Sequence, residues 1–379
     1  MKILHLLYES EGDYFGIGGV GVRAYEIYRR LKDRHDITLL CKRYPGAKDS
    51  LIQGLRHVHV GVESRSLTVT LLAYARQASR YVRENGTGYD IIVEEFSPAI
   101  PTFLDSYHER QVVLQVQGYT GTKYFVKYNP LYSTVLYLSE RIRPPRYRNI
   151  ILVSEESRKR YGMDESRGRR IGVISNGISP ELLSGRPGIG DYILYLGRID
   201  VHHKGLDILL RAYHEFRASR PDIRLVIAGD GRDRENFTRL LGRLPAETQA
   251  GIRQAGWVDG DAKINLFSDA LLVVVPSRYE TQGIVTLEAM ACGKALVVSD
   301  IPELSHVVSS GAGVSFRSED ASALAAVLTV LINGHDLQAM GQRGREWVKD
   351  YTWDSVALRF EEYLLSVANN ARAVRPQSL

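Results

Sequence analysis

The chain has 379 residues, of which 44% are hydrophobic and 25% are charged. This length exceeds one ordinary hydrophobic core and predicts a globular protein of two domains. The longest apolar runs are far shorter than a membrane span, and the start MKILHLLY has no cleavage-type site, so we expect a buried first strand, no signal peptide and a cytosolic protein.

Positive charge is concentrated in the first half of the chain. Residues 1–180 have 27 lysines and arginines against 19 acidic residues (+8), and the remainder has 22 against 25 (−3). This predicts either an anionic partner, such as lipid or substrate, or a solvated arginine-rich surface. No recognition motif accompanies the arginines, so nucleic acid is not expected as a partner. Cys41 and Cys292 match no metal spacing and are expected to be reduced core thiols.

In the first half, short β-branched runs alternate with amphipathic stretches. Residues 20–34 and 67–84 have apolar side chains at helical spacing. The expected strands are 2–8, 36–41, 89–96, 111–116 and 149–154. This alternation is typical of a parallel sheet covered by helices on both faces.

The second half repeats this plan after a glycine-rich segment at 185–190, which is the expected linker. The expected strands are 191–197, 222–229, 270–276 and 295–299. The expected helices are 205–218, 233–241, 262–267, 283–291, 320–333, 336–348 and 353 to about 368.

The predicted fold is therefore α/β, with two doubly wound Rossmann-like domains facing a central cleft. Residues 1–185 form the N-terminal domain, which the C-terminal helix at about 354–379 joins, and residues 186–353 form the C-terminal domain. Ligands of such sheets bind at the carboxyl ends of the strands, so the loops that follow strands are the candidate sites.

The first such loop, GDYFGIGGVGVR at 12–23, has glycines at 16, 18, 19 and 21. Gly18 and Gly19 let the backbone approach a ligand closely, and the helix behind them offers N–H groups to an anion. The loop lacks a P-loop lysine, and the alternative is a glycine-rich turn without a ligand.

Three further segments of the second domain are candidate sites. Arg198 and Lys204, in GRIDVHHKG, combine positive charge with helix-end amides and suit a pyrophosphate, unless they are only surface cations. Gly229, in IAGDG, is expected to back a nucleotide. The backbone of Val258, in GWVDG, can meet a base, and the neighbouring Trp257 is either a lid aromatic or part of the core.

Two glutamates eight positions apart stand in RYETQGIVTLEAMACG, where a strand gives way to a helix. The amides of Gly283, Ile284 and Val285 are expected to face phosphate. Glu288, about one and a half turns into the helix, can accept two hydrogen bonds from a diol such as ribose. Glu280 can meet a sugar hydroxyl or offset positive charge at a reacting carbon. The alternative is a pair of acids placed for the helix dipole.

Together these segments resemble glycosyltransferase family 4, whose members are retaining enzymes of the GT-B fold. RYETQGIVTLEAMACG is similar to the E-x7-E signature of the family, and GGVG, ISNGIS, GRIDVHHKG, IAGDG and AGWV agree with it in order and spacing. The resemblance implies transfer of a hexose-type sugar from a nucleotide-diphosphate donor, with UDP the favoured nucleotide, to a glycan or lipid-linked acceptor. It also implies a role in cell-surface polysaccharide or glycolipid biosynthesis on the cytoplasmic side, without a metal or a cofactor.

The resemblance also assigns roles to individual residues. Arg198 and Lys204 match the pair that holds the donor pyrophosphate. Glu280 matches the acid beside the donor hexose and Glu288 the acid on the ribose. The GGVG loop matches the one that faces donor and acceptor, and the last helix matches one that returns to the first domain.

Two positions depart from the family pattern. Gln117 stands where a histidine is often found near the reacting sugar, and an amide can bond a sugar hydroxyl but cannot take up a proton. Gln117 and Glu280 are therefore the two candidate catalytic residues. Gln282 stands where an aromatic residue usually precedes the glycine, which changes the expected pocket wall.

Other functions remain open at this point. Gln117 would also suit a nucleotide-sugar-binding protein with weakened catalysis, and a nucleotide-sugar epimerase shares the two-domain build. An oxidoreductase is disfavoured because the first loop lacks the dinucleotide fingerprint. Residues 117–148, rich in tyrosine and arginine, are expected to contact acceptor sugars or an anionic membrane surface, or to form a packed helix with a basic face.

Overall fold

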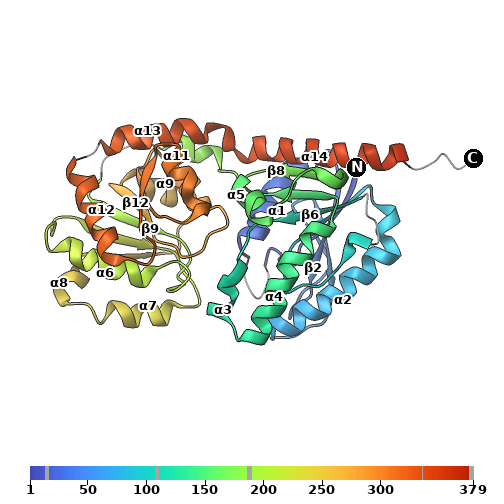
Figure 1. Ribbon diagram of the computed structural model, residues 1–379, viewed down its shortest axis with the longest axis horizontal. Helices are drawn as coiled ribbons and strands as arrows, with labels where there is room; N and C mark the ends of the chain where they lie inside the picture. Colours follow the sequence, from blue (N-terminus) through green and yellow to red (C-terminus); the bar gives the residue numbers. More distant parts are fainter. Residues whose placement is uncertain (13–16, 107–110, 186–189, 335, 375–379) are drawn as a thin grey trace, which may run out of the picture. The chain divides into compact units, whose positions relative to one another are not determined.

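The computed structural model describes residues 1–12, 17–106, 111–185, 190–334 and 336–374 (Figure 1). The chain divides into two compact units. Unit 1 comprises Met1–Asn176 and Trp353–Leu379, and unit 2 comprises Gly177–Thr352. Each contains one mainly parallel sheet between helices, so the predicted α/β fold of two doubly wound domains is confirmed. The central cleft stays a prediction.

The sheet of unit 1 has eight strands in the order β3-β4-β2-β1-β5-β6-β7-β8. All neighbouring pairs are parallel except β3 and β4. The chain winds outward from β1 in one direction and then, from β5, in the other. The strands are β1 Lys2–Leu6, β2 Asp36–Lys42, β3 Ser50–Ile52, β4 Leu55–Val60, β5 Ile91–Glu95, β6 Val112–Val116, β7 Asn149–Leu152 and β8 Arg170–Val173.

Helices cover both faces of this sheet because successive strand residues point to opposite sides. Ile3 and Ile91 pack on the side of the first and last helices, whereas Leu4 and Ile92 pack on the side of the second. The helices are α1 Gly19–Leu31, α2 Leu67–Asn85, α3 Tyr124–Lys127, α4 Pro130–Ile142, α5 Glu155–Tyr161 and α14 Trp353–Val374.

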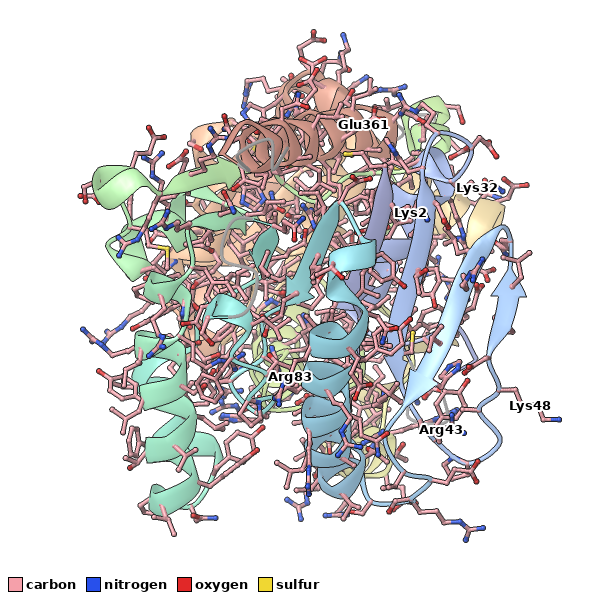
Figure 2. The ribbon with its side chains drawn as sticks, turned by 90° about the vertical axis from the view of Figure 1, so that its right-hand side faces the viewer. Lys2, Lys32, Arg43, Lys48, Arg83 and Glu361 are labelled. Carbon is pink, nitrogen blue, oxygen red and sulfur yellow. The ribbon has the colours of Figure 1, made fainter. Side chains whose placement is uncertain are left out.

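The last helix, α14, returns to unit 1, as the resemblance implies. Phe360 and Leu364 are buried in the same core as Tyr28 of α1. Glu361, labelled in Figure 2, accepts one hydrogen bond from His35 and forms an ion pair with Arg34 at 2.7 Å. The core of unit 1 is therefore built from both ends of the chain.

The sheet of unit 2 has six parallel strands in the order β11-β10-β9-β12-β13-β14. They are β9 Tyr192–Leu196, β10 Arg224–Ala228, β11 Ile252–Gly256, β12 Leu272–Val275, β13 Leu296–Ser299 and β14 Gly313–Phe316. The helices are α6 Leu206–Arg217, α7 Arg234–Leu241, α8 Ala246–Ala250, α9 Gly260–Ser268, α10 Ile284–Ala291, α11 Ser305–Ser309, α12 Ala321–Gly334 and α13 Leu337–Val348. Separate hydrophobic clusters fill the two faces.

The boundary between the units lies between Asn176 and Gly177, nine residues before the predicted one. Ile178 and Leu182 are buried in the core of unit 2, so this segment already belongs to the second domain. Gly185, at the start of the predicted linker, accepts a hydrogen bond from Arg345 of unit 2 at 3.0 Å. The rest of that linker, residues 186–189, lies outside the described residues.

The two cysteines and the longer apolar helices bear on two further predictions. Cys41 and Cys292 are buried thiols, as predicted. Within the described ranges, no single helix has the length and hydropathy to cross a membrane. The bent pair Ala321–Gly334 and Leu337–Tyr351 meets these criteria by length and composition alone. Leu324, Leu328 and Leu331 of this pair are buried in the core of unit 2.

Candidate active site

The predicted ligand-binding residues of unit 2 follow the carboxyl ends of four neighbouring strands. Arg198 and Lys204 follow β9, Gly229 follows β10, Val258 follows β11 and Glu280 follows β12. These strands are parallel neighbours in the order β11-β10-β9-β12, so their following loops lie at one edge of the sheet.

Lys204 and Glu280 meet directly at this edge. The Lys204 Nζ donates to Glu280 Oε1 at 2.6 Å, and the Ser277 hydroxyl donates to the same oxygen at 2.8 Å. Burial acts to raise the pKa of Glu280, but the charge of Lys204 and these two hydrogen bonds outweigh it and hold the pKa below the usual 4.5. Glu280 is therefore ionised at neutral pH. The cation and the acid, predicted to contact different parts of a ligand, also form an ion pair.

Arg278 joins the two loops that carry this ion pair. Its guanidinium donates two hydrogen bonds, each 2.8 Å long, to the two carboxylate oxygens of Asp207 at the start of α6. It also donates to the carbonyl of His202 at 2.8 Å. Two parallel hydrogen bonds of this kind fix the orientation of the two loops better than a single contact does. Sequence reasoning missed Arg278, although it stands two positions before Glu280.

The same two loops are also in backbone contact. Gly205, with φ of +67°, lies so near β12 that a Cβ there would be 2.0 Å from the carbonyl oxygen of Pro276. Only glycine combines this φ with this approach without strain. Gly205, the last residue of GRIDVHHKG, therefore has a structural role in bringing Lys204 to Glu280.

The helix α10 begins between the two glutamates, where the sequence predicted a phosphate site. Its N-cap, Gly283, has φ of +69° and has no side chain with which to cap the helix. Ile284 and Val285 form the first turn and are partly buried. Gly283 therefore does not itself cap the first amides of α10, and this suits a phosphate site.

Glu288, in the second turn of α10, is paired with a lysine that sequence reasoning missed. The Lys263 Nζ of α9 donates to Glu288 Oε1 at 2.7 Å. Each acid of the signature thus faces its own lysine. The role of Glu288 toward ribose stays a prediction.

The remaining predicted residues of unit 2 differ in exposure. The Arg198 side chain is 58% exposed and lies 3.8 Å from Asp200, so it is free to reorient toward a ligand. Trp257 is 73% exposed, which excludes the core interpretation. Its neighbour Val258 is partly buried.

Gly229 has a packing reason to be glycine. Its φ is +132°, and a Cβ would lie 1.9 Å from the carbonyl oxygen of Gly197. Its N–H donates to the carbonyl of Gly256 at 2.6 Å. This amide is therefore occupied by the protein, and a contact between the Gly229 backbone and a nucleotide stays a prediction.

In unit 1, the glycine loop is already occupied by an acid of the chain. The backbone N–H groups of Gly18 and Gly21 both donate to Glu9 Oε2 at 2.8 Å. The prediction that the start of α1 offers free N–H groups is wrong for these two amides, because Glu9 occupies them. A Cβ at Gly19 would meet none of the described atoms within 4 Å, so this glycine lies open. Gly16 lies outside the described residues.

Gln117 is buried just after β6, against the acid that ends the adjacent strand. Its Nε2 lies 3.3 and 3.4 Å from the two carboxylate oxygens of Glu95, the last residue of β5. Glu95 also accepts a hydrogen bond from Gln115 and lies 3.3 Å from Nε2 of His5. The run IIVEEF contained this signal, because two acids end a wholly buried strand.

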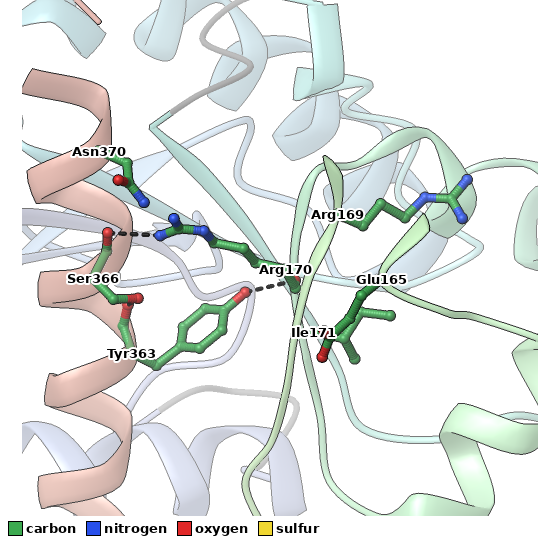
Figure 3. A pocket seen from close by; sticks show the side chains of 7 residues that line it. All are labelled: Glu165, Arg169, Arg170, Ile171, Tyr363, Ser366 and Asn370. Carbon is green, nitrogen blue, oxygen red and sulfur yellow. Dashed lines mark hydrogen bonds between the residues drawn. The ribbon is translucent and has the colours of Figure 1, made fainter. Parts of the chain in front are cut away.

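A separate hollow lies at the edge of unit 1, between β8 and α14 (Figure 3). Arg170 donates to the carbonyl of Ser366 at 2.7 Å, and the Tyr363 hydroxyl donates to the carbonyl of Arg170 at 2.9 Å. These arginine contacts hold α14 to the sheet. None of the predicted site residues lines this hollow, whose lining is Glu165, Arg169, Arg170, Ile171, Tyr363, Ser366 and Asn370.

Histidine, cysteine and acidic side chains within the described ranges do not gather in groups of three or more that could hold a metal ion. The expectation that the chain needs no metal stays a prediction. The chemistry that this site displays rests on carboxylates, lysines and backbone amides.

Comparison with known proteins identifies the family. Residues 17–182 match Glycosyltransferase Family 4, and residues 184–347 match Glycosyl transferases group 1. The phosphatidyl-myo-inositol mannosyltransferase of Mycolicibacterium smegmatis is 27% identical over 358 residues, or 90% of this chain and 88% of the relative. The protein of the same name from Mycobacterium tuberculosis is 30% identical over 261 residues, or 65% and 68%.

Solved structures agree with this match. Sucrose-phosphate synthase of Thermosynechococcus elongatus superposes with a TM-score of 0.78 at 20% identity, over 97% of this chain and 99% of that one. HepE of Anabaena in complex with UDP-glucose gives 0.70 at 17% identity, over 97% and 100%. The chain therefore belongs to glycosyltransferase family 4, has the GT-B fold and is a glycosyltransferase.

Proposed function

We propose that the chain transfers a hexose-type sugar from a nucleotide-diphosphate donor to a glycan or lipid-linked acceptor, with retention at the anomeric carbon. The transfer would serve cell-surface polysaccharide or glycolipid biosynthesis at the cytoplasmic side. The observation that carries this proposal is the partly buried Lys204–Glu280 ion pair at the strand edge from which α10 begins.

The chemistry of a sugar nucleotide matches the groups at this edge. A pyrophosphate is anionic and is bound by cations and helix-end amides, which Lys204, Arg198 and the start of α10 supply. Glu280 is ionised, so it accepts a hydrogen bond from a sugar hydroxyl and stabilises positive charge at the anomeric carbon as the phosphate leaves. Lys204 then bridges the acid and the leaving phosphate.

Retention follows if the acceptor attacks from the side of the leaving group. The bond from the anomeric carbon to the phosphate oxygen breaks as the bond to the acceptor oxygen forms, and the acceptor proton passes to the leaving phosphate. The protein orients the reactants and stabilises charge. In this mechanism the side-chain amide of Gln117 forms a hydrogen bond with a sugar hydroxyl.

The relatives support the choice of donor and acceptor. HepE was solved with UDP and with UDP-glucose, so UDP is the favoured nucleotide here. The mycobacterial relatives are named for transfer of mannose to a phosphatidyl-inositol, which supports a hexose and a lipid-linked acceptor.

The test combines donor binding with transfer. A thermal-shift panel of UDP-, GDP- and ADP-sugars identifies the nucleotide, and NMR of the product from the labelled donor shows the anomeric configuration. Glu280→Gln should reduce kcat by about 100-fold or more, because a charge-stabilising group is lost. The control Glu346→Gln changes an exposed acid that is also paired with a lysine, Lys349, and should leave kcat unchanged.

Full activity of Glu280→Gln would refute its role, and an inverted product would refute retention. A donor-dependent shift without transfer would favour the weakened binding protein. Interconversion of donor sugars without an acceptor would favour the epimerase.

A further inference from the structure

The outer face of α4 is apolar where an exposed helix normally presents polar residues. Ser133, Leu136 and Glu140 point into unit 1 and are buried. The opposite face carries Leu131, Val135, Leu138 and Ile142, which are between 47% and 79% exposed. At about 100° per residue, these four lie within an arc of roughly 60° and form one stripe along the helix. We call them the α4 stripe.

Basic residues outnumber acidic ones in the segment that carries the α4 stripe, although Arg143 is buried against Glu94 and Arg146 is paired with Asp105. Residues 117–148 contain six lysines and arginines and a single acid, Glu140. Glu140 faces inward and accepts hydrogen bonds from the N–H groups of Thr120 and Gly121 at 2.8 and 2.7 Å and from the Tyr124 hydroxyl at 3.0 Å. The acid of the segment is therefore withdrawn from the surface, while Arg141 and Arg148 are exposed.

Aromatic side chains flank the start of the stripe. Phe125, Tyr128 and Tyr132 are between 39% and 45% exposed. Aromatic rings of this kind are favoured where an apolar medium meets water. An apolar stripe with aromatic and basic flanks is the composition of a helix that lies in the plane of a membrane surface.

A second apolar group lies at the same end of the sheet. The helix α2 follows β4 and α4 follows β6, and both strands are parallel members of one sheet. The starts of the two helices therefore extend beyond the same edge, as Figures 1 and 2 show. Leu67, Val69 and Leu72, at the start of α2, are between 38% and 54% exposed.

We propose that the α4 stripe, supported by the start of α2, inserts into the surface of an anionic lipid bilayer. Apolar side chains enter the interface, and the basic flanks attract acidic headgroups. The sequence left open whether 117–148 contacts a membrane or forms a packed helix with a basic face. The structure shows a packed helix whose outer face is apolar, and this favours the membrane.

Vesicle sedimentation of the full chain tests this inference. Vesicles of phosphatidylcholine alone are compared with vesicles containing 30% phosphatidylglycerol, at low and high salt. The chain should bind the anionic vesicles, and less so at high salt. Leu131→Gln/Leu138→Gln should weaken this binding by at least about tenfold, because two apolar side chains no longer leave water.

The matched control is Leu358→Gln/Leu365→Gln on α14. These leucines have the same spacing of seven residues and are 49% and 38% exposed, but they stand outside the α4 stripe. The control should bind as the unchanged chain does. Equal binding by the stripe variant, or no binding of the unchanged chain to either vesicle, would overturn the proposal.

Sedimentation velocity without lipid provides a second readout. Self-association that the stripe variant abolishes would assign the stripe to a second copy of the chain and would also overturn the proposal. The donor-dependent thermal shift should persist in the stripe variant, because the substituted leucines lie outside unit 2. Loss of vesicle binding with a preserved thermal shift therefore distinguishes a failure at the membrane from a failure of the proposed function.

Discussion

Arg278 shows how much the site depends on contacts that are remote in sequence. Its partner Asp207 is 71 positions away, and the two meet because β9 and β12 are neighbours in the sheet. The strand-end rule located Lys204 and Glu280 but gave no sign that they pair with each other, because strand order is a property of the fold. Glu9, which occupies the glycine-loop amides, was missed for a different reason: it lies 9 and 12 positions from Gly18 and Gly21 in the same connection, and the path of that connection is not evident from the sequence.

A lysine at position 278 would keep the charge but lose the two-pronged contact. We expect Arg278→Lys to lower kcat/KM at least about tenfold, because the Glu280 loop is then less firmly placed. Steady-state kinetics with the identified donor measure this. Arg224→Lys is the control, since Arg224 forms an exposed pair with Asp191 away from the site. Unchanged kinetics of Arg278→Lys would show that the loops need no such link.

At the scale of the elements, the buried strands were predictable and the edge strands were not. Every residue of β5, β6 and β7 is buried, and each strand contains a run of at least three apolar residues that the sequence reveals. By contrast, β8 is only partly buried along its length, and β11 has polar and exposed residues at its centre. An edge strand packs less of its surface, so its sequence lacks the run that identifies a strand.

Loop packing at the site gives a test at this scale. Gly205 and Gly256 have nearly the same φ, +67° and +70°, but a Cβ at Gly256 would meet none of the described atoms within 4 Å. Gly256→Ala should cost about 1–2 kcal/mol of unfolding free energy, from the backbone alone. Gly205→Ala should cost at least about 2 kcal/mol more, because the methyl group meets the Pro276 carbonyl.

Urea unfolding of both variants measures this difference. Equal losses of stability would mean that the two loops can separate at little cost. Lys204 and Glu280 would then be held together by their own charges and by Arg278.

At the scale of the whole molecule, stability should depend on pH through one buried histidine in unit 1 and one partly buried histidine in unit 2. Burial lowers the pKa of His57 in unit 1 and that of His306 in unit 2, the latter to about 4. A histidine with a lowered pKa stays neutral in the folded chain while the unfolded chain takes up a proton below about 6.5. Stability should therefore fall as the pH decreases from 6.5 toward 4.

His306→Gln should reduce the pH dependence of the unfolding free energy by about 1–2 kcal/mol between pH 7 and 5. Urea titrations at the two pH values measure it. The control is His214→Gln, because exposed His214 bonds the hydroxyl of Thr248 at 2.8 Å, the distance that His306 keeps from Thr286. An unchanged pH dependence in His306→Gln would show that His306 is protonated without cost.

The return of α14 to unit 1 affects how the protein can be made. During synthesis the ribosome releases residues 1–176 long before Phe360 and Leu364, so the apolar side of α1 that these residues cover stays open until translation is nearly complete. A fragment cut at residue 176 should therefore aggregate unless α14 is supplied as a peptide or attached through a designed connection.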